Sequence, residues 1–306
     1  MTRHPAGPMA LAPEIERALI RSQPVVALES SVIAHGLPAP HNLEAAREVE
    51  ERVRAAGAVP ATVAVIDGVV RIGLADEELE RLATEPQTRK VGPRDLAATV
   101  LSGECGGTTV GGTLAVCAIS GIHFLATGGI GGVHRGWQQT GDISADLREL
   151  SGSPVCVVCS GAKSLLDVAA TLELLETLGV PVVGFGTSSF PLFYVRESVH
   201  ELTDRVDDPG TVAALVGAHW GFARSTGVLV ARPVAAELAL DPALVESWVA
   251  EALEAAQHDG VAGSAITPFV LAHLHERSGG ASLAANRRLL ADNAGLAAEI
   301  AVAYFS

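Results

Sequence analysis

The segment S160-G-A-K-S-L-L-D167 contains the residue best suited to covalent chemistry, Lys163. A lysine that is partly desolvated and lies near the positive end of a helix dipole gives up its proton more readily than a lysine in water. Its free amine can attack a carbonyl carbon, and its ammonium form can bind a phosphate. A solvated lysine beside a helix start is the alternative interpretation of Lys163.

Glu29 is a second candidate because it follows the apolar run V25-V-A-L28 directly. A carboxylate at the end of a buried strand is costly unless it is paired. Burial favours the protonated form of a carboxyl group, which suits a general acid or base. A structural role, as the partner of a buried donor, is the alternative for Glu29.

Asp142 and Asp146 are four positions apart, a spacing that places two side chains on one side of a helix. If residues 143–150 are helical, both carboxylates lie near the positive end of that helix. Asp142 then fits an N-cap, and both residues also fit an oxygen-ligand site for Mg²⁺ or Mn²⁺. The residues alone favour capping for Asp142 and leave the role of Asp146 open.

The segment A126-T-G-G-I-G-G-V-H-R135 is rich in glycine and carries Thr127, His134 and Arg135. Backbone N–H groups of such a loop can bind phosphate oxygens. The dinucleotide and P-loop fingerprints are absent, because His134 and Ala162 stand where those motifs require glycine. A tight turn is the alternative, but the polar side chains favour an anion site.

Other polar segments are less informative. Lys90, in the basic segment T88-R-K-V-G-P-R94, is either a phosphate ligand or a solvated loop residue. His273 and His275 lack a metal-ligand spacing, and we expect both to lie on the surface of a helix.

Elements that can position these candidates follow from the apolar pattern. V155-C-V-V-C159 is a continuous apolar run, typical of a strand covered on both faces. A second apolar run covers 180–185, and between them apolar residues recur at helical spacing: Leu165, Val168, Leu172 and Leu175. This strand–helix–strand unit predicts a parallel sheet. Lys163 is then expected in the first turn of the helix, at the sheet edge where open α/β folds bind ligands.

The remaining pattern predicts an α/β fold with one central sheet. We expect a strand over 122–126, a hairpin over 61–73 that turns at Asp67-Gly68, and a helix over 43–56 capped by Asn42. Further helices are predicted over 76–83, 93–101, 113–119, 241–257 and 283–302. We interpret the chain as a single domain over residues 1–306, with residues 1–12 flexible.

Composition restricts the possible partners. The chain has 306 residues, of which 48% are hydrophobic and 18% charged, so it is globular. Its net charge of -14, without a basic run, argues against nucleic acid and anionic membranes as partners. No apolar run reaches membrane-spanning length, and no signal peptide is evident. The four cysteines are expected to be core residues in a reducing compartment, so we expect a cytoplasmic protein.

Several segments together resemble a known family. They are A27-L-E-S-S-V-I-A-H-G-L-P38, K90-V-G-P-R-D95, G111-G-T-L-A115, L125-A-T-G-G-I-G-G-V-H-R-G136, D142-I-S-A-D-L147, S160-G-A-K-S-L-L-D167 and F185-G-T-S-S-F-P191. In this order they are similar to the pseudouridine-5'-phosphate glycosidases, also called the indigoidine synthase A-like family. The resemblance runs from about Val25 to the C-terminal helices. Some relatives carry a fused sugar-kinase domain, which we do not expect in this chain.

The resemblance implies an enzyme, a C-glycosidase with lyase character. It would reversibly hydrolyse pseudouridine 5'-phosphate to uracil and ribose 5-phosphate in pseudouridine catabolism. Because the bond broken is carbon–carbon, the family needs a stronger electron sink at the sugar C1' than an oxocarbenium ion provides. An amine provides one, through an iminium-type adduct on the lysine that matches Lys163. The resemblance also implies an α/β/α core with a largely parallel or mixed sheet, and a homotrimer.

Individual site residues carry over from the family by position. Lys163 matches the nucleophile, Glu29 the proton donor, and Asp146 a residue that assists proton transfer. Asp142 matches the metal position, usually manganese with magnesium as an alternative, and this replaces its interpretation as a cap. The substrate-binding positions are Lys90, Val110, Thr127, His134, Ser144, Ala145, Asp146 and Asn286, of which Val110 acts through its backbone and Asn286 recognises uracil.

Two other functions fit parts of this pattern. A sugar-phosphate lyase of aldolase type would use the same lysine and phosphate groups on another substrate. A binding or accessory protein of a pigment-biosynthesis cluster would need no catalytic set. The presence of Glu29, Asp142, Asp146 and Lys163 together argues against the second alternative. Asn286 and the metal position favour a nucleobase substrate over the first.

Overall fold

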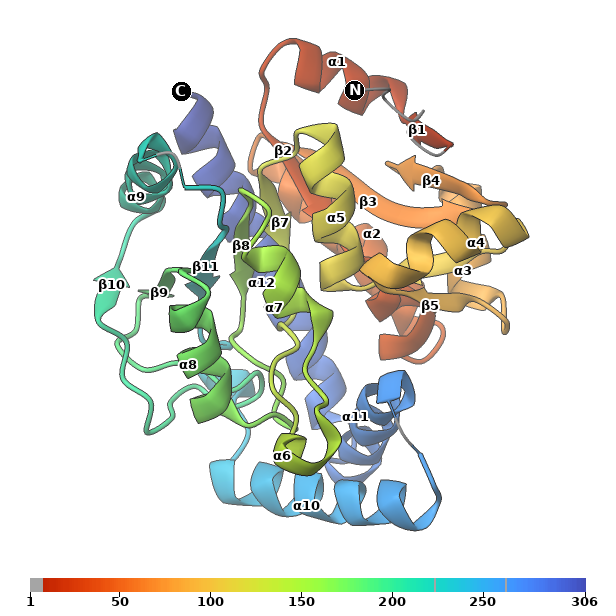
Figure 1. The fold of residues 1–306 in the computed structure, drawn as a ribbon, viewed down its shortest axis with the longest axis vertical. Helices are drawn as coiled ribbons and strands as arrows, with labels where there is room; N and C mark the ends of the chain where they lie inside the picture. Colours follow the sequence, from red (N-terminus) through yellow and green to blue (C-terminus); the bar gives the residue numbers. More distant parts are fainter. Residues whose placement is uncertain (1–7, 223, 262) are drawn as a thin grey trace.

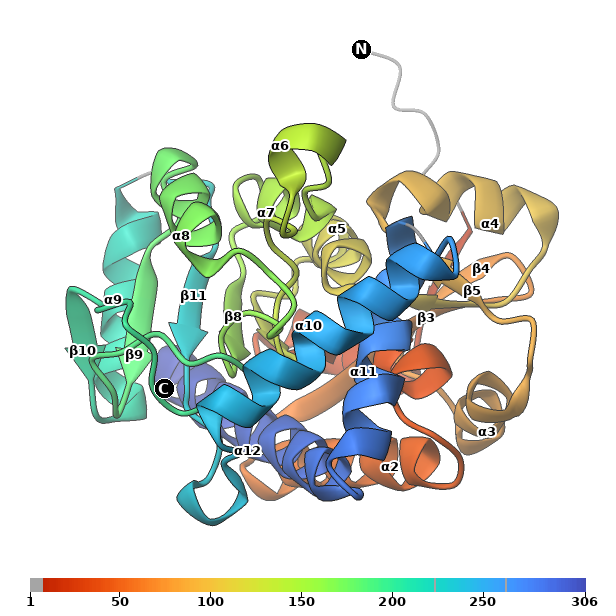
Figure 2. The same ribbon diagram turned by 90° about the horizontal axis from the view of Figure 1, so that it is seen from below.

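A central sheet runs through the protein and is covered by helices on both faces (Figures 1 and 2). The computed structural model describes residues 8–222, 224–261 and 263–306. Within them the strand order is β1-β4-β3-β2-β7-β8-β11-β9-β10, and β6 joins β5 to β3. The strands are β1 Met9–Leu11, β2 Val25–Leu28, β3 Val59–Ile66, β4 Val69–Ile72, β5 Arg89–Val91, β6 Gly106–Thr108, β7 Phe124–Ala126, β8 Cys156–Cys159, β9 Val182–Phe185, β10 Asp204–Val206 and β11 Val228–Ala231.

The middle of the sheet is parallel. β2 pairs with β7, β7 with β8, and β8 with β11, all in the same direction. Among the described pairs, β3 runs antiparallel to β4 and to β6. The middle strands are entirely buried because their apolar runs are covered on both sides. The predicted α/β class with a largely parallel or mixed sheet is therefore confirmed.

Helices form a layer on each face. The long helix α12 packs against β2, β7 and β8 and is flanked by α2 and α9. Helices α5, α7 and α8 lie on the opposite face of the sheet (Figure 2). The helices are α1 Pro13–Ile20, α2 His41–Ala55, α3 Asp76–Thr84, α4 Leu96–Ser102, α5 Val110–Ser120, α6 Trp137–Thr140, α7 Ala145–Leu150, α8 Val168–Thr177, α9 Pro209–Gly221, α10 Pro242–His258, α11 Ile266–Arg277 and α12 Ala281–Phe305.

Short turns of other helix types complete the chain. Val32–Gly36 forms a single π-helical turn, η1, between β2 and α2. Pro93–Asp95, Ala236–Leu238 and Gly263–Ala265 form the 3-10 turns η2, η3 and η4. Helices α10 and α11 pack on each other at the end of the molecule near α6 (Figure 1). This end carries the segments that follow β2, β7 and β8.

Most predicted elements are present, including the hairpin of β3 and β4. Asp67 and Gly68 form its turn with φ values of 49° and 73°, as a tight hairpin requires. The helix predicted from Leu165 was wrong in its start, because α8 begins at Val168 with Asp167 as its cap. Leu165 is buried in the preceding loop, so its apolar character reflects core packing and not helical periodicity.

Two further expectations differ from the structure. Asn42 lies inside α2, which begins at His41, and its side chain donates to the carbonyl oxygens of Ile33 and Ala83 at 3.0 and 2.9 Å. Asn42 therefore joins helices and does not cap one. Of the segment expected to be flexible, residues 1–7 lie outside the described residues, whereas β1 is a strand paired with β4.

The cysteines have the predicted core role. Cys105, Cys117, Cys156 and Cys159 are all free and buried. Burial raises the pKa of the Cys117 and Cys159 thiols to about 12, so both are protonated and inert at neutral pH. Within the described ranges, no helix combines the length and apolarity needed to cross a bilayer.

Candidate active site

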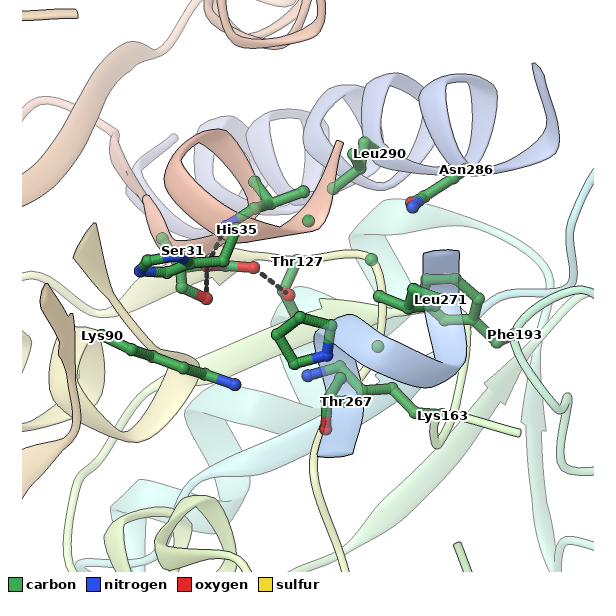
Figure 3. A pocket seen from close by; sticks show the side chains of 16 residues that line it. Ser31, His35, Lys90, Thr127, Lys163, Phe193, Thr267, Leu271, Asn286 and Leu290 are labelled. Carbon is green, nitrogen blue, oxygen red and sulfur yellow. Dashed lines mark hydrogen bonds between the residues drawn. The ribbon is translucent and has the colours of Figure 1, made fainter. Parts of the chain in front are cut away.

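Three predicted site residues meet because they follow neighbouring parallel strands. Glu29 comes after β2, Thr127 after β7, and Lys163 in the loop after β8. The carboxyl ends of these strands lie at one edge of the sheet, where α/β folds bind ligands. All three line one pocket, together with Ser31, Val32, His35, Gly36, Lys90, Gly128, Gly129, Phe193, Thr267, Pro268, Leu271, Asn286 and Leu290 (Figure 3).

The loop of Lys163 is held by the glycine-rich loop beside it. Lys163 N donates to Ile130 O at 3.2 Å, and Ile130 N donates to Gly161 O at 3.0 Å. Gly161 has a φ of +78°, and a Cβ there would overlap the Pro191 carbonyl oxygen. The prediction that Lys163 lies in the first turn of a helix was wrong, because α8 begins only at Val168. The hydrogen bonds between the two loops and the left-handed backbone conformation of Gly161 fix the position of Lys163.

Glu29 is held at the entrance to η1. Its Oε2 accepts hydrogen bonds from Ser31 Oγ at 2.7 Å and from Val32 N at 3.1 Å. Its Oε1 accepts a longer one, 3.5 Å, from Thr127 Oγ1. Glu29 is only 9% exposed, so these donors satisfy a nearly buried carboxyl group that faces the pocket. Such a group can donate or accept a proton at a bound ligand.

Lys90 reaches the same pocket from β5. Burial, and after it the positive charge of Lys163, lower its pKa to about 8, against the opposing effects of Glu29 and Asp146. Figure 3 shows Lys90 and Lys163 entering the pocket from different sides. The pocket thus brings two lysines and one carboxylate, Glu29, together in a protein whose net charge is -14.

Asp146 is a buried connector. Its Oδ1 accepts from Gly111 N at 2.7 Å, and its Oδ2 accepts from Gly131 N at 2.8 Å. These bonds join α5 and the glycine-rich loop to α7. The predicted positions Val110, Ser144 and Ala145 belong to the same cluster, because Val110 starts α5, Ala145 starts α7, and Ser144 caps α7. The cluster adjoins the pocket without lining it.

Asp142 lies outside the pocket lining, beside His134. His134 Nδ1 is 3.8 Å from Asp142 Oδ2, and the backbone N–H of His134 donates to Asp142 O at 3.0 Å. Burial lowers the pKa of His134 even though Asp142 opposes the shift, so its imidazole is neutral at pH 7. The helix cap in this segment is Ser144, which excludes the alternative that Asp142 caps α7.

The two side chains near Asp142 that could bind a metal, Asp142 itself and His134, are too few to surround an ion on their own. In the part of the chain that the structure describes, no group of three or more His, Cys, Asp or Glu side chains is arranged to hold a metal. One carboxylate and one neutral imidazole can bind an ion that keeps water or phosphate as its other ligands, as Mg²⁺ does. They do not form a closed cage.

Some predicted polar groups have other partners. Arg135 pairs with Glu246 of α10 through Nη1–Oε1 and Nη2–Oε2 contacts of 2.6 and 2.8 Å, so it is not directed at an anion in the pocket. His273 and His275 were expected on a helix surface, and both lie half-buried on α11, with His273 Nε2 3.7 Å from Glu251 Oε2.

Sequence reasoning missed several residues of the pocket. Ser31 and His35 lie in a motif that had been recognised, close to Glu29, and that proximity was the available signal. Nothing in the sequence around Phe193 or around the residues of α11 indicates that they line a pocket. Asn293, from α12, donates to Thr127 O at 2.9 Å and Ser160 Oγ at 3.1 Å, and so positions both loops.

Lysine and carboxylate side chains that meet at the carboxyl edge of a parallel sheet are typical of α/β enzymes. This is the class to which the fold and the site assign the chain. Residues 14–303 match the family described as indigoidine synthase A like protein. The chain therefore belongs to the indigoidine synthase A-like family and is an enzyme of that family.

Relatives and solved structures agree with this assignment. The chain is 50% identical to a pseudouridine-5'-phosphate glycosidase of Herpetosiphon aurantiacus over 97% of this chain and 98% of the relative. It is 51% identical to one of Streptomyces griseus, over 96% and 91%. The prealnumycin C-glycosynthase AlnA, solved in complex with ribulose 5-phosphate, is 39% identical with a TM-score of 0.89 over 98% of each chain. An indigoidine synthase A-like protein from Thermotoga maritima is 35% identical with a TM-score of 0.90, over 100% of this chain and 99% of that one.

Proposed function

We propose that the protein reversibly cleaves the C-glycosidic bond of pseudouridine 5'-phosphate, with water, to give uracil and ribose 5-phosphate. The observation that carries this proposal is the convergence of Lys163, Glu29 and Lys90 on one pocket. The names of the relatives, which denote cleavage or formation of C-glycosides, support the bond type. The ribulose 5-phosphate bound by a structural neighbour supports a sugar phosphate as ligand.

Lys163 is the proposed nucleophile. Its amine bonds to C1' as the C1'–O4' bond of the sugar ring breaks, and an amine proton passes to O4', which becomes a hydroxyl. The C1'–C5 bond then breaks with its electron pair remaining on uracil C5, while the nitrogen lone pair forms the new C=N bond. Glu29, which is nearly buried in the same pocket, supplies the proton that C5 takes up. C1' is left as an iminium on the lysine nitrogen, and water returns the amine and the aldehyde of ribose 5-phosphate.

Binding of the phosphate is assigned to the glycine-rich loop and its neighbours. We propose that Thr127 and His134 contact the phosphorylated sugar, with Lys90 as a cationic partner and Asn286 facing the base. Asp146 holds the glycine-rich loop, because its Oδ2 accepts a hydrogen bond from Gly131 N. Val110, Ser144, Ala145 and Asp146 are further proposed substrate contacts. Assistance in proton transfer by Asp146 is a further proposal.

A divalent ion is proposed at Asp142, with manganese favoured over magnesium. Asp142 would hold it, and the neutral imidazole of His134 lies beside that carboxylate. When bound, the ion would offset the negative charge of the phosphate. We further propose a place in pseudouridine catabolism, a cytoplasmic location and assembly as a homotrimer, which sedimentation of the purified protein tests.

Uracil release from pseudouridine 5'-phosphate, with and without Mn²⁺, tests the proposal. Wild type should release uracil with Mn²⁺, Lys163→Ala should not, and Asp142→Asn should need a higher Mn²⁺ concentration. No release by folded wild type with Mn²⁺ would exclude the glycosidase. Trapping with borohydride on other phosphorylated sugars would then test the aldolase-type alternative.

A further inference from the structure

Arg135 is the last residue of the glycine-rich segment 126–135, and it does not line the pocket of Lys163. Its guanidinium group contacts two other segments of the chain. Nη1 and Nη2 donate to Oε1 and Oε2 of Glu246 on α10 at 2.6 and 2.8 Å. Nη2 also donates to Ser164 O at 3.2 Å, and Ser164 directly follows Lys163. One arginine side chain therefore links α10 to the loop that carries the proposed nucleophile.

The bond to Ser164 O is one of several that hold this loop in place. Lys163 N donates to Ile130 O at 3.2 Å, within the core of the site. Ser164 Oγ donates to Leu192 O at 3.1 Å. The bond from Arg135 differs from these two because it comes from a charged side chain that is 35% exposed. Its removal should therefore change the position of the loop without unfolding the protein.

Glu246 fixes the direction of the guanidinium group. Two parallel bonds between an arginine and a carboxylate give more geometric specificity than a single contact. The hydrogen bonding of Arg135 lowers the pKa of Glu246, so the carboxylate is charged at neutral pH. Because Glu246 belongs to α10, the orientation of Arg135 depends on where that helix lies. The support that Ser164 O receives depends on the position of α10 in the same way.

Helix α10 is connected by packing to another wall of the pocket. It packs against α11, and Thr267 and Leu271 of α11 line the pocket (Figure 3). The loop of Lys163 lines the same pocket from the sheet edge. The contacts of Arg135 therefore join the loop that carries the amine to the pair of helices that forms the opposite part of the lining.

We propose that Arg135 is a positioning residue, which holds the loop of Lys163 against α10 so that the amine meets the sugar C1'. This inference rests on the proposed function. A displacement of about 1 Å can lower the rate of such an attack by about a hundredfold. The alternative role for Arg135 is direct contact with the substrate phosphate. The two roles differ in kinetics, because a positioning residue affects the covalent step, whereas a phosphate ligand affects KM.

The experiment measures uracil release and the rate at which the Lys163 adduct forms. Samples with saturating ribose 5-phosphate are quenched with borohydride at successive times, and the labelled protein is measured by mass spectrometry. Arg135→Met keeps the aliphatic stem but removes the donors. It should lower kcat and the rate of adduct formation by about tenfold or more, with KM within about twofold of wild type. Arg135→Lys keeps the charge but lacks the planar fork, so it should recover only part of the loss.

Arg54→Met is the matched control. Arg54 of α2 donates to both carboxylate oxygens of Glu14 at 2.9 and 2.6 Å and lies outside the pocket lining. Its replacement should leave kcat, KM and adduct formation unchanged. A raised KM with unchanged kcat in Arg135→Met would assign Arg135 to the phosphate and overturn the inference. A kcat within about twofold of wild type, or equal losses in both variants, would also overturn it, as would the absence of an adduct in wild type. Failure of the proposed function is distinct, because wild type would then form an adduct without releasing uracil.

Discussion

Lys90 on β5 and Lys163 in the loop after β8 line the same pocket, and the charge of Lys163 is felt at Lys90. Burial and then this charge lower the pKa of Lys90 to about 8, against the opposing effects of Glu29 and Asp146. Two lysines close to one another without a ligand are electrostatically unfavourable. An anion such as a phosphorylated sugar relieves that repulsion, so the pocket is arranged to receive negative charge.

The first prediction concerns pH and Lys90. Lysine binds a phosphate in its charged form, and Lys90 loses that charge as the pH rises through about 8. Lys90→Arg keeps its charge, so the ratio of its kcat/KM to that of wild type should rise above pH 8, by about tenfold per pH unit. The ratio of the two kcat/KM values removes the effect of every other group that titrates equally in wild type and in Lys90→Arg. A ratio that stays constant from pH 7 to 9.5 would show that Lys90 does not bind the phosphate.

Lys90 also affects stability. Its pKa is about 8 in the folded protein and near its ordinary value of 10.5 when unfolded. Between these values the unfolded chain binds more protons, so stability rises with pH. Below pH 8 the cost of the buried charge is fully present. Lys90→Met should therefore increase the free energy of unfolding at pH 7 by about 1–3 kcal/mol.

Urea titration at several pH values measures this gain. It should shrink as the pH rises from 8 to 10.5, because the lysine is then neutral in both states. The same variant should bind ribose 5-phosphate more weakly. A loss of stability at pH 7 would contradict the prediction.

Replacement of the proposed nucleophile should separate activity from folding. Lys163→Ala should lower uracil release by at least about a thousandfold. Its fold should remain, because Lys163 is half-buried in a loop whose bonds are made by its backbone. Borohydride with ribose 5-phosphate should label wild type and Lys90→Met but not Lys163→Ala, as read by mass spectrometry. Loss of soluble, folded Lys163→Ala would count against this prediction.

The two aspartates of the D142-I-S-A-D146 segment should differ in their effect on stability. Asp146→Asn replaces an acceptor of the bonds from Gly111 N and Gly131 N by an amide group, which leaves one N–H facing another. We expect a loss of about 2–4 kcal/mol in chemical unfolding. Asp142→Asn is the control, because its carboxylate is 35% exposed, and it should cost less than about 0.5 kcal/mol. Equal losses in the two variants would refute the role of Asp146 as a connector.

The loop of Lys163 depends on a glycine. Gly161→Ala places a methyl group against the Pro191 carbonyl oxygen and a side chain at a positive φ, so we expect both lower stability and a large loss of activity. Gly186→Ala has a similar φ of +69° but no atom within 4 Å of the added carbon. It isolates the backbone cost, about 1 kcal/mol. Thermal unfolding of both variants separates the backbone cost from the steric cost. Equal decreases in Tm would show that the methyl group of Gly161→Ala does not clash with the Pro191 carbonyl oxygen.

The parts of the site that the sequence predicted well are those set by local pattern. Glu29 and Thr127 directly follow apolar runs, Lys163 follows one after a short loop, and parallel strands bring such ends together. The sequence could not predict the start of α8, because buried leucines in a loop have the same hydrophobicity as those on a helix face. It also could not show that Asp146 accepts from two backbone amides, since one belongs to the first turn of α5 and the other to the glycine-rich loop.

Long-range packing accounts for the rest. Lys90 reaches the pocket because β5 pairs with β6, which pairs with β3, and no spacing in the sequence encodes that register. The part of the pocket lined by Leu271 and Asn286 requires α11 to lie against η1 and α12 to lie against α11. The sequence pattern showed that α12 exists but not what it faces.

The position of α12 has a consequence for synthesis of the protein. Its residues Asn286 and Leu290 line the pocket, and Asn293 holds the loops after β7 and β8. While the chain is still growing on the ribosome, Glu29 and Lys163 have emerged long before this helix. The reactive amine therefore stays without its complete surroundings until residues 286–293 have also left the ribosome, so a nascent chain shorter than this carries Lys163 without its finished pocket.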